Sequence, residues 1–336
     1  MKKYIFSFFF VLSYFVLRAQ QNVSALLASG IHDAKLFTYS YFEPASQGAM
    51  YSISNGWYHS ANVKKPLRFD VKIVGNVSFV DKEHHKFRLN AVDYEHLRFA
   101  DGSLSKEVST AFGQNDPEIE VYVDYETLTG TEREYFNLPD GFGEMGTKLI
   151  PNAFIQASIG VFKGTEIKGR YFPSVKYDDL ETSFYGGALQ HEFTSWIPGS
   201  DLLPFAVSGI VAYTHLDASY DFTKTELIEG ENQLIKANLN TWMFAAIVST
   251  KLPIINFYGG LGYVKGTSNI DLKGTYHIQT GVIQNETVVD PFGIEHEIGG
   301  IKADLGMSLK FGFFRLNADY SFQKYQNVSV GIGFGI

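Results

Sequence analysis

The sequence predicts an all-β fold, a transmembrane antiparallel β-barrel with a short helical N-terminal segment that is periplasmic or plugs the barrel. Three observations support this prediction: an export signal, the lack of any later apolar run long enough for a membrane-spanning helix, and strict alternation near the C-terminus. We expect about twelve strands, and the pattern allows ten to fourteen.

The first twenty residues predict a signal peptide. Lys2 and Lys3 precede an apolar run of fourteen residues, 4–17, and the small residue Ala19 lies at the expected cleavage point. As a helix the run rises only about 21 Å, too little to cross a bilayer. The alternative is an N-terminal core helix. No cysteine follows the run, so a lipid-anchored lipoprotein is excluded.

Composition excludes several classes of function. Removing Lys2, Lys3 and Arg18 with the signal changes the formal net charge from −8 to −11, which argues against nucleic acid as a partner. The chain has no cysteine, so it contains no disulfide, thiol chemistry or thiolate metal site. A membrane protein without spanning helices must be a closed barrel, because lipid satisfies no backbone hydrogen bond.

Three consecutive C-terminal segments, 301–311, 314–323 and 327–336, alternate with a period of two. In the last, Val330, Ile332 and Phe334 share one face, while Ser329 and Gly333 lie on the other. Seven further segments have wall character: 67–79, 153–162, 165–175, 182–194, 204–216, 240–252 and 255–266. The sequence thus identifies ten strands, and residues 80–152 and 267–299 are each long enough to hold a further pair of strands.

The connections support the orientation of an outer-membrane barrel. With the C-terminus placed in the periplasm, the short connections 163–164, 195–203, 253–254 and 312–313 are periplasmic. The outer connections are 80–152, 176–181, 217–239, 267–299 and 323–327, which include the longest and most polar ones. The first strand then begins in the periplasm.

Residues 21–66 form a separate N-terminal segment before the barrel of residues 67–336. Apolar residues of 23–37 follow a helical stripe, and an aromatic loop region follows, with Trp57 and Tyr58 near its end. Two interpretations remain open: a helix along the periplasmic rim, or a plug inside the barrel.

The predicted lumen face carries eight charged side chains. They are Arg68, Asp70, Lys72, Lys302, Asp304, Lys310, Arg315 and Asp319. The strands 67–79 and 327–336 must meet to close the wall, so these charges are expected to cluster. Either they pair and fill a narrow lumen, or they line a constriction that contacts ions or a substrate.

Other chemistry is sparse, and we expect no catalytic residues, no metal and no cofactor. The acidic segment 115–134 matches no calcium-loop spacing, and the nine histidines form no HExxH pattern. A barrel hydrolase would need a Ser or Asp beside a histidine on the outer rim, where His215 with Asp217 is the best candidate.

The chain resembles a family of outer-membrane barrels known only as a domain of unknown function. The resemblance rests on Asn55-Gly56-Trp57-Tyr58, residues 65–70 and 163–168, residues 196–199 with 203–205, and residues 251–253 with 258–263. More distantly, a periplasmic N-terminal segment leading through an aromatic loop into a barrel is similar to the long-chain fatty-acid (FadL-type) transporter family. That similarity implies passive uptake of hydrophobic molecules; the family's Asn-Pro-Ala-Gly run is absent here.

We therefore expect an exported outer-membrane protein in contact with lipid, most simply a passive channel or transporter for small or hydrophobic solutes. The alternatives are a non-conducting structural or assembly barrel that binds a partner through its outer loops or periplasmic segment, and a barrel hydrolase. A wide lumen with unpaired charges favours transport, whereas a filled lumen favours the structural barrel.

Overall fold

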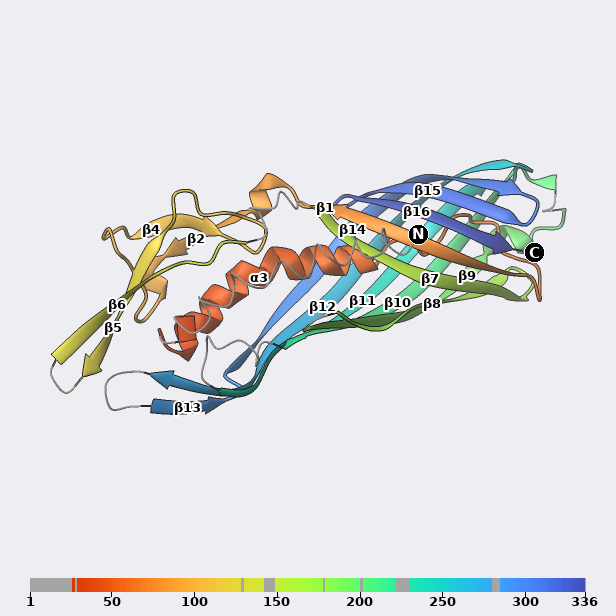
Figure 1. Cartoon of the computed structure of the whole chain (residues 1–336). Coiled ribbons are helices and arrows are strands. Elements are labelled where there is room, and N and C mark those ends of the chain that lie inside the picture. The colour runs from red at the N-terminus through yellow and green to blue at the C-terminus, as the bar shows by residue number, and fades with distance from the viewer. Residues whose placement is uncertain are drawn as a thin grey trace.

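A closed antiparallel barrel of ten strands dominates the computed structural model of the chain (Figure 1). The structure describes residues 26–27, 29–127, 130–141, 149–177, 179–199, 202–221, 230–279 and 285–335. The expected signal peptide, 1–20, lies outside them. The wall strands are β1 (Phe69–Phe79), β7 (Leu149–Phe162), β8 (Thr165–Tyr177), β9 (Leu180–Glu192), β10 (Phe205–Asp221), β11 (Gly230–Thr250), β12 (Ile255–Gln279), β14 (Phe292–Phe311), β15 (Phe314–Phe322) and β16 (Asn327–Gly335).

Each wall strand pairs with two neighbours, so the wall has no free edge. β1 pairs with β16, with Ile73 opposite Ile332, and on its other side with β7. β11 pairs with β12 on the far side of the ring. The ten strands read from the sequence are these ten, and the predicted meeting of the first and last strands is confirmed.

The wall is apolar outside and polar inside. In β1, Ile73 is 60% exposed while the neighbouring Val74 and Asp70 are buried; in β16, Phe334 is 57% exposed while Ser329 is buried. Period-two alternation places these sets on opposite faces, and the large apolar side chains point away from the lumen. This arrangement is that of a transmembrane barrel.

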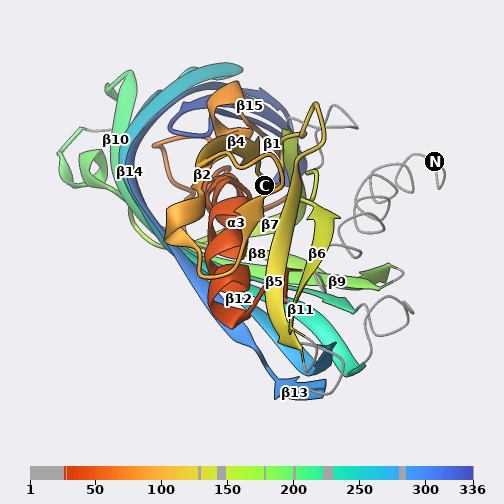
Figure 2. The same cartoon turned by 90° about the vertical axis from the view of Figure 1, so that its left-hand side faces the viewer.

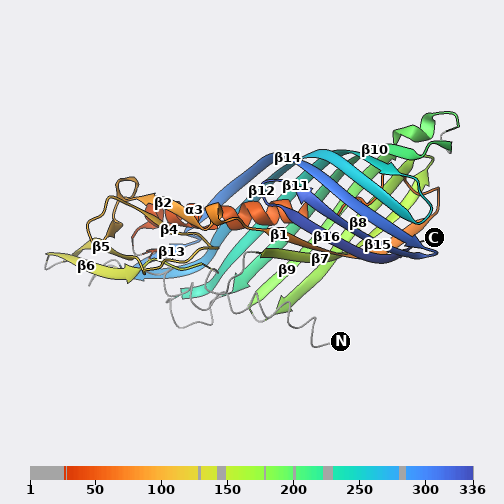
Figure 3. The ribbon, with the colours of Figure 1, turned by 90° about the horizontal axis from the view of Figure 1, so that it is seen from above.

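The two ends of the barrel differ. The connections 163–164, 251–254 and 312–313 lie with the C-terminal strand end at one end, which we call the short-turn end. Residues 80–141 and 285–291 lie at the other, the long-loop end, apart from the undescribed 128–129. There β10, β11, β12 and β14 continue well past the shorter β1, β15 and β16, so that one side of the wall is taller (Figure 3). The longest connection, between β1 and β7, therefore lies at the opposite end from the tight turns 163–164 and 312–313, as the sequence predicted. The lengths do not alternate strictly, because the connection between β9 and β10 at the short-turn end is longer than the one between β15 and β16.

Neither long connection supplies an extra wall strand, so the wall has ten strands rather than the central expectation of twelve. Residues 267–279 and 292–299 prolong β12 and β14, and β13 (Asn285–Val289) pairs only with the outer part of β12. The connection between β1 and β7 folds into a unit of its own, which we call the insert domain (residues 81–141).

The insert domain contains two small sheets and two short 3₁₀ helices. One sheet joins β2 with β4, and the other has the order β3-β5-β6. Its elements are η1 (Lys82–His84), β2 (Lys86–Asn90), η2 (Ala91–Asp93), β3 (Arg98–Phe99), β4 (Ser105–Ser109), β5 (Glu120–Thr127) and β6 (Gly130–Asn137). A further 3₁₀ helix, η4 (Phe193–Trp196), lies at the short-turn end.

Helix α3 (Ile31–Ile53) passes from the insert domain into the lumen (Figures 1 and 2). The expected N-terminal helix is present, but it overlaps the predicted range 23–37 only at 31–37 and extends to Ile53, because the residues expected to form an aromatic loop continue it. Aromatic residues and an interior Pro44 are poor helix formers, so packing on both sides stabilises this helix. Within the described residues, no helix is both long and apolar enough to cross a membrane.

The helix ends at Ser54 and Asn55, whose side chains both donate to the carbonyl of Tyr51, at 2.7 and 2.8 Å. Gly56 then adopts a left-handed conformation, with φ of 74°. Its α-hydrogen faces Val74 and Phe154, which leave little room for a side chain. This turn directs residues 57–66 down the lumen to β1. We call residues 54–66 the descending segment.

Candidate functional site

The lumen is filled by the C-terminal half of α3 and by the descending segment. We call α3 and the descending segment together (residues 31–66) the plug. Met50, Tyr51, Ile53, Trp57 and Tyr58 are all buried in one apolar cluster with inward side chains of the wall. Because α3 contacts β1 and β7 on one side and β11, β12 and β14 on the other, it lies within the ring rather than on its rim. The helix begins at the long-loop end, opposite to the end expected for the N-terminal segment.

Inward glycines of the wall accommodate the plug. A side chain at Gly260 would collide with the Tyr58 hydroxyl, and one at Gly300 with the Tyr51 hydroxyl. Glycine in a strand permits such close approach. The plug and the wall are therefore fitted to each other.

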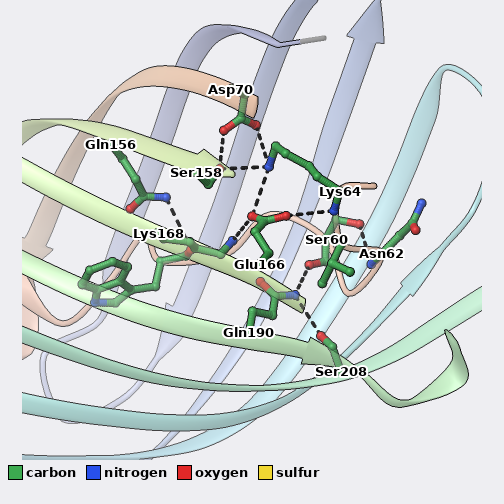
Figure 4. A network of polar contacts seen from close by, with 12 residues as sticks. Ser60, Asn62, Lys64, Asp70, Gln156, Ser158, Glu166, Lys168, Gln190 and Ser208 are labelled. Atoms are coloured by element: carbon green, nitrogen blue, oxygen red, sulfur yellow. Dashed lines mark hydrogen bonds and ion pairs between the residues drawn. The ribbon is translucent and has the colours of Figure 1, made fainter. Parts of the chain in front are cut away.

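Charged residues connect the descending segment to the wall at the short-turn end (Figure 4). The Lys64 ammonium lies 3.1 Å from Asp70 of β1 and 3.0 Å from Glu166 of β8. Lys72 contacts Asp70 at 3.5 Å, and Lys168 contacts Glu166 at 3.1 Å. Each carboxylate thus serves two lysines.

A second polar group lies nearer the middle of the lumen. Lys302 contacts Asp304 at 3.3 Å and donates to Asn55 at 2.7 Å. The Tyr58 hydroxyl donates to Asp304. Most of this group joins the plug to β14.

The arginine on β8 completes the attachment. Arg170 donates to the carbonyl of Ile53 at 2.9 Å and to Gln156 at 3.1 Å. Its guanidinium lies 3.5 Å from the ring centre of Trp57, a cation–π contact. This pair explains why Trp57 follows the helix-ending Asn55-Gly56.

The eight charged residues predicted for the lumen divide into two sets. Asp70, Lys72, Lys302 and Asp304 form ion pairs, and Asp319 accepts a hydrogen bond from Tyr258 at 2.9 Å. The other three, Arg68, Lys310 and Arg315, line a cavity at the short-turn end. Among the described residues, Arg315 donates to carbonyls of its own turn, including that of Phe314 at 3.1 Å.

This cavity, which we call the chamber, has a volume of about 250 Å³. It lies between the descending segment and the ends of β1, β8, β14 and β15. Seven cationic side chains and two carboxylates line it. The cations are Lys64, Lys65, Arg68, Lys72, Lys168, Lys310 and Arg315, and the carboxylates are Asp70 and Glu166.

Sequence reasoning missed several members of this site. Glu166, Lys168 and Arg170 alternate with outward residues in β8, so the period-two pattern could have identified them. Lys64 and His59 belong to the non-periodic descending segment and carry no such signal.

A smaller apolar cavity of about 80 Å³ lies at the long-loop end. Phe37 and Tyr41 of α3 face Ile270, Leu272 and Phe292 of the extended wall across it. The plug therefore has a cationic chamber near one end and an apolar cavity near the other.

The insert domain holds the upper part of the helix. The buried carboxylate of Asp33 accepts hydrogen bonds from the backbone N–H groups of Glu95, His96 and Leu97, at 2.7, 2.8 and 2.9 Å. Phe37 also belongs to the apolar core of the insert domain. The helix is thus fixed to the barrel at one end and to the insert domain at the other.

The β5–β6 hairpin is the most exposed part of the insert domain. β6 pairs only with β5, and nearly all its residues are exposed. Arg133 binds Asp124 through two hydrogen bonds of 2.7 and 2.9 Å, which hold the pKa of Asp124 below its ordinary value. No group of three or more potential metal-binding His, Asp or Glu side chains occurs among the residues that the structure describes.

The histidine proposed for a hydrolase lies on the lipid-facing side of the wall. His215 bonds Asp217 of its own strand at 2.9 Å and Asn240 of β11 at 2.8 Å. Tyr185 lies beside it, and the ring of Tyr213 contacts that of Trp242 at a tilted angle. In the contacts that the structure describes, the predicted Ser or Asp on a neighbouring strand is replaced by Asn240. His215 belongs instead to a patch of interfacial aromatic residues.

The chain belongs to a family of unknown function, DUF6588, whose model matches residues 1–336. The resemblance to an uncharacterised family is thereby confirmed. No curated protein is significantly similar to the chain.

Several solved barrels are weakly similar. The attachment invasion locus protein Ail of Yersinia pestis has 10% identity and a TM-score of 0.30, covering 81% of this chain and 99% of its own. The translocator domain of the autotransporter NalP from Neisseria meningitidis has 10% identity and a TM-score of 0.30, covering 82% and 89%. OmpT of Vibrio cholerae has 13% identity and a TM-score of 0.20, covering 80% and 98%. Scores this low carry no argument about function. No long-chain fatty-acid transporter is among these three, so that distant resemblance stays a prediction.

Proposed function

We propose that this member of the DUF6588 family is a closed outer-membrane barrel that holds its insert domain rigidly at the cell surface to bind a partner. The observation that carries the proposal is the lumen filled by α3 and the descending segment. A filled lumen favours a non-conducting barrel over an open channel.

The attachments of the plug support a permanent rather than a transient closure. A buried ion pair between Lys64 and Glu166 and a hydrogen bond from Lys302 to Asn55 connect it to the wall, and Arg170 binds the end of the helix. Removing one partner from a buried ion pair typically costs about 3–5 kcal/mol, so releasing the plug into water is costly unless all these contacts are replaced.

The insert domain is the element best placed to meet a partner. Its two sheets are separate from the sheet of the wall, and its β5–β6 hairpin projects farthest from the barrel (Figure 1). Glu118, Glu120, Glu132 and Glu134 are exposed on or beside this hairpin. An exposed edge strand with this charge suits a cationic extended segment, which can add to the sheet edge.

The orientation is tested by cysteine labelling, because the chain has no native cysteine that would also react. Leu104→Cys lies in the insert domain and Leu202→Cys at the short-turn end, where the native side chains are 73% and 90% exposed. On intact cells, a membrane-impermeant maleimide should label the first and not the second. Labelling of the second alone would reverse the orientation and remove the proposal.

Closure is tested by conductance. The hydroxyls of Ser60 and Ser249 lie 3.2 Å apart, so Ser60→Cys with Ser249→Cys can form a disulfide that locks the descending segment to β11. In planar bilayers, with a general porin as positive control, we expect no channel events from the wild type or from either redox form of the double variant. Channels that appear only in the reduced form would refute permanent closure.

A passive transporter for small or hydrophobic solutes is the second candidate. The observation that favours it is the pair of cavities near the two ends of the plug, one cationic and one apolar. Transport would require the descending segment to move, so conductance or solute uptake that the Ser60–Ser249 disulfide abolishes would support it.

A further inference from the structure

The chamber at the short-turn end has an excess of positive charge that its own carboxylates do not balance. Lys64 contacts both Asp70 and Glu166, Lys72 contacts Asp70, and Lys168 contacts Glu166. Both carboxylates are therefore already shared. Within the described residues, Lys310 and Arg315 contact no carboxylate, although both line the cavity.

This excess is local, because the chain as a whole is acidic. Cations that face a partly enclosed cavity lose hydration, and an unpaired desolvated charge is unfavourable. Fields from several cations add within a low-dielectric cleft and concentrate anions there. The chamber thus has the electrostatics of an anion site.

A second, independent feature lies on the same lining. His59, Ser308 and Asn317 are almost fully buried, with exposed fractions of 4%, 7% and 4%. Both ring nitrogens of His59, the Ser308 hydroxyl and both amide atoms of Asn317 lack a hydrogen-bond partner among the described residues. The nearest carboxylate oxygen to His59, from Asp319, is 3.9 Å away. Buried polar groups normally form hydrogen bonds, so several without a partner on the lining of one cavity point to a ligand.

We propose that the chamber binds a small solute that carries a phosphate or carboxylate group and arrives from the short-turn end. Lys310 and Arg315 supply unpaired positive charge, and Ser308, Asn317 and His59 supply hydrogen-bond donors for the oxygens. The source is a free solute rather than a lipid headgroup, because the chamber lies inside the ring. The proposal goes beyond the closed barrel and does not depend on whether the barrel conducts.

The test is titration calorimetry on the full mature protein in a phospholipid-free, non-ionic detergent and a phosphate-free buffer. The probes are inorganic phosphate and glycerol 3-phosphate, with glycerol as the neutral control. We expect saturable binding of both anions and none of glycerol. Lys310→Gln and Arg315→Gln should each weaken binding at least tenfold, because each removes a charged hydrogen-bond donor to the anion; tenfold corresponds to about 1.4 kcal/mol.

Two further variants separate a binding effect from a folding effect. Lys163→Gln removes the same charge from an exposed turn at the same end, outside the chamber, and should bind like the wild type. Ser308→Ala removes only an orphan hydroxyl and should bind more weakly while leaving the fold unchanged by circular dichroism. Equal binding by the wild type, Lys310→Gln and Ser308→Ala would overturn the site. So would binding that occurs only when phosphatidylglycerol is supplied in a nanodisc, which would mark a lipid headgroup site.

Discussion

Asp33→Ala should release the insert domain from α3 while leaving the barrel closed. The carboxylate accepts three backbone N–H groups at 2.7–2.9 Å and is 1% exposed. Leu97 is buried, so its N–H stays unpaired after the substitution, at a cost of about 2 kcal/mol. Glu95 and His96 are exposed and regain water, so each loses roughly 1 kcal/mol. The total is about 4 kcal/mol.

Hydrogen exchange measured by mass spectrometry on the detergent-solubilised protein reads this loss directly. About 4 kcal/mol corresponds to roughly a thousandfold faster exchange for amides that open by undocking, here residues 94–99. Amides of β1 and β16 should be unaffected. Asp101→Asn is the matched control, because Asp101 is a half-exposed carboxylate whose partner is Lys106.

Unchanged exchange at 94–99 in Asp33→Ala would refute the reasoning, since it would mean that the apolar contacts alone hold the insert domain. Faster exchange throughout β1 and β16 would also refute it, because the insert domain and barrel would then unfold as one unit. Unchanged exchange at 94–99 would not, however, show that the insert domain has separated from α3.

Three other substitutions or conditions test different contacts. Gly160→Ala should destabilise the barrel by about 1–3 kcal/mol in urea unfolding, because a side chain there collides with backbone carbonyls of the descending segment. Gly169→Ala is the control, since a side chain there has open space and should be tolerated. Equal effects of the two substitutions would contradict this packing. Trp57→Ala should lower the free energy of unfolding by about 3–5 kcal/mol, and Trp242→Ala by much less, because Trp57 is fully buried and Trp242 is half-exposed. If the unfolding midpoints showed the reverse order, the buried position of Trp57 in the plug would be contradicted. Hydrogen bonds from Arg133 on the facing strand lower the pKa of Asp124 in the folded hairpin. The ionised carboxylate therefore stabilises the hairpin at neutral pH, and this stabilisation is lost as the pH falls below the ordinary pKa of 3.8 and through the lower folded value. The amides of β5 and β6, corrected for intrinsic rates, should exchange faster in acid, and protection that does not change with pH would contradict the pairing.

Much of the wall could be predicted from sequence, and the physical reason is local. Alternation such as Val330-Gly331-Ile332 records which side of a strand faces lipid, and it needs no knowledge of distant residues. Closure of the wall, which a barrel in lipid requires, then places the first and last strands side by side.

The plug could not be predicted in this way. Its helix contains Tyr39, Tyr41 and Pro44, residues that favour other structures in isolation, and it exists because the lumen and the insert domain enclose it. The chamber depends on Lys64 and His59, whose positions follow from the turn at Gly56 rather than from any period. Partners that are distant in sequence, such as Asn55 and Lys302, leave no local pattern.

The passage of the chain through its own ring has a consequence for biogenesis. Helix α3 starts at one end of the barrel and the chain reaches β1 at the other, yet β1 is also half of the seam that β16 completes. Strand β16, which is synthesised after all the other wall strands, therefore closes the barrel around helix α3, which is synthesised before them. The order of events is constrained: the helix must be threaded before or while the seam forms, because afterwards only the two mouths remain open. A chain whose helix is late should mature into an unthreaded by-product with the same wall, separable from the native form by its greater sensitivity to protease.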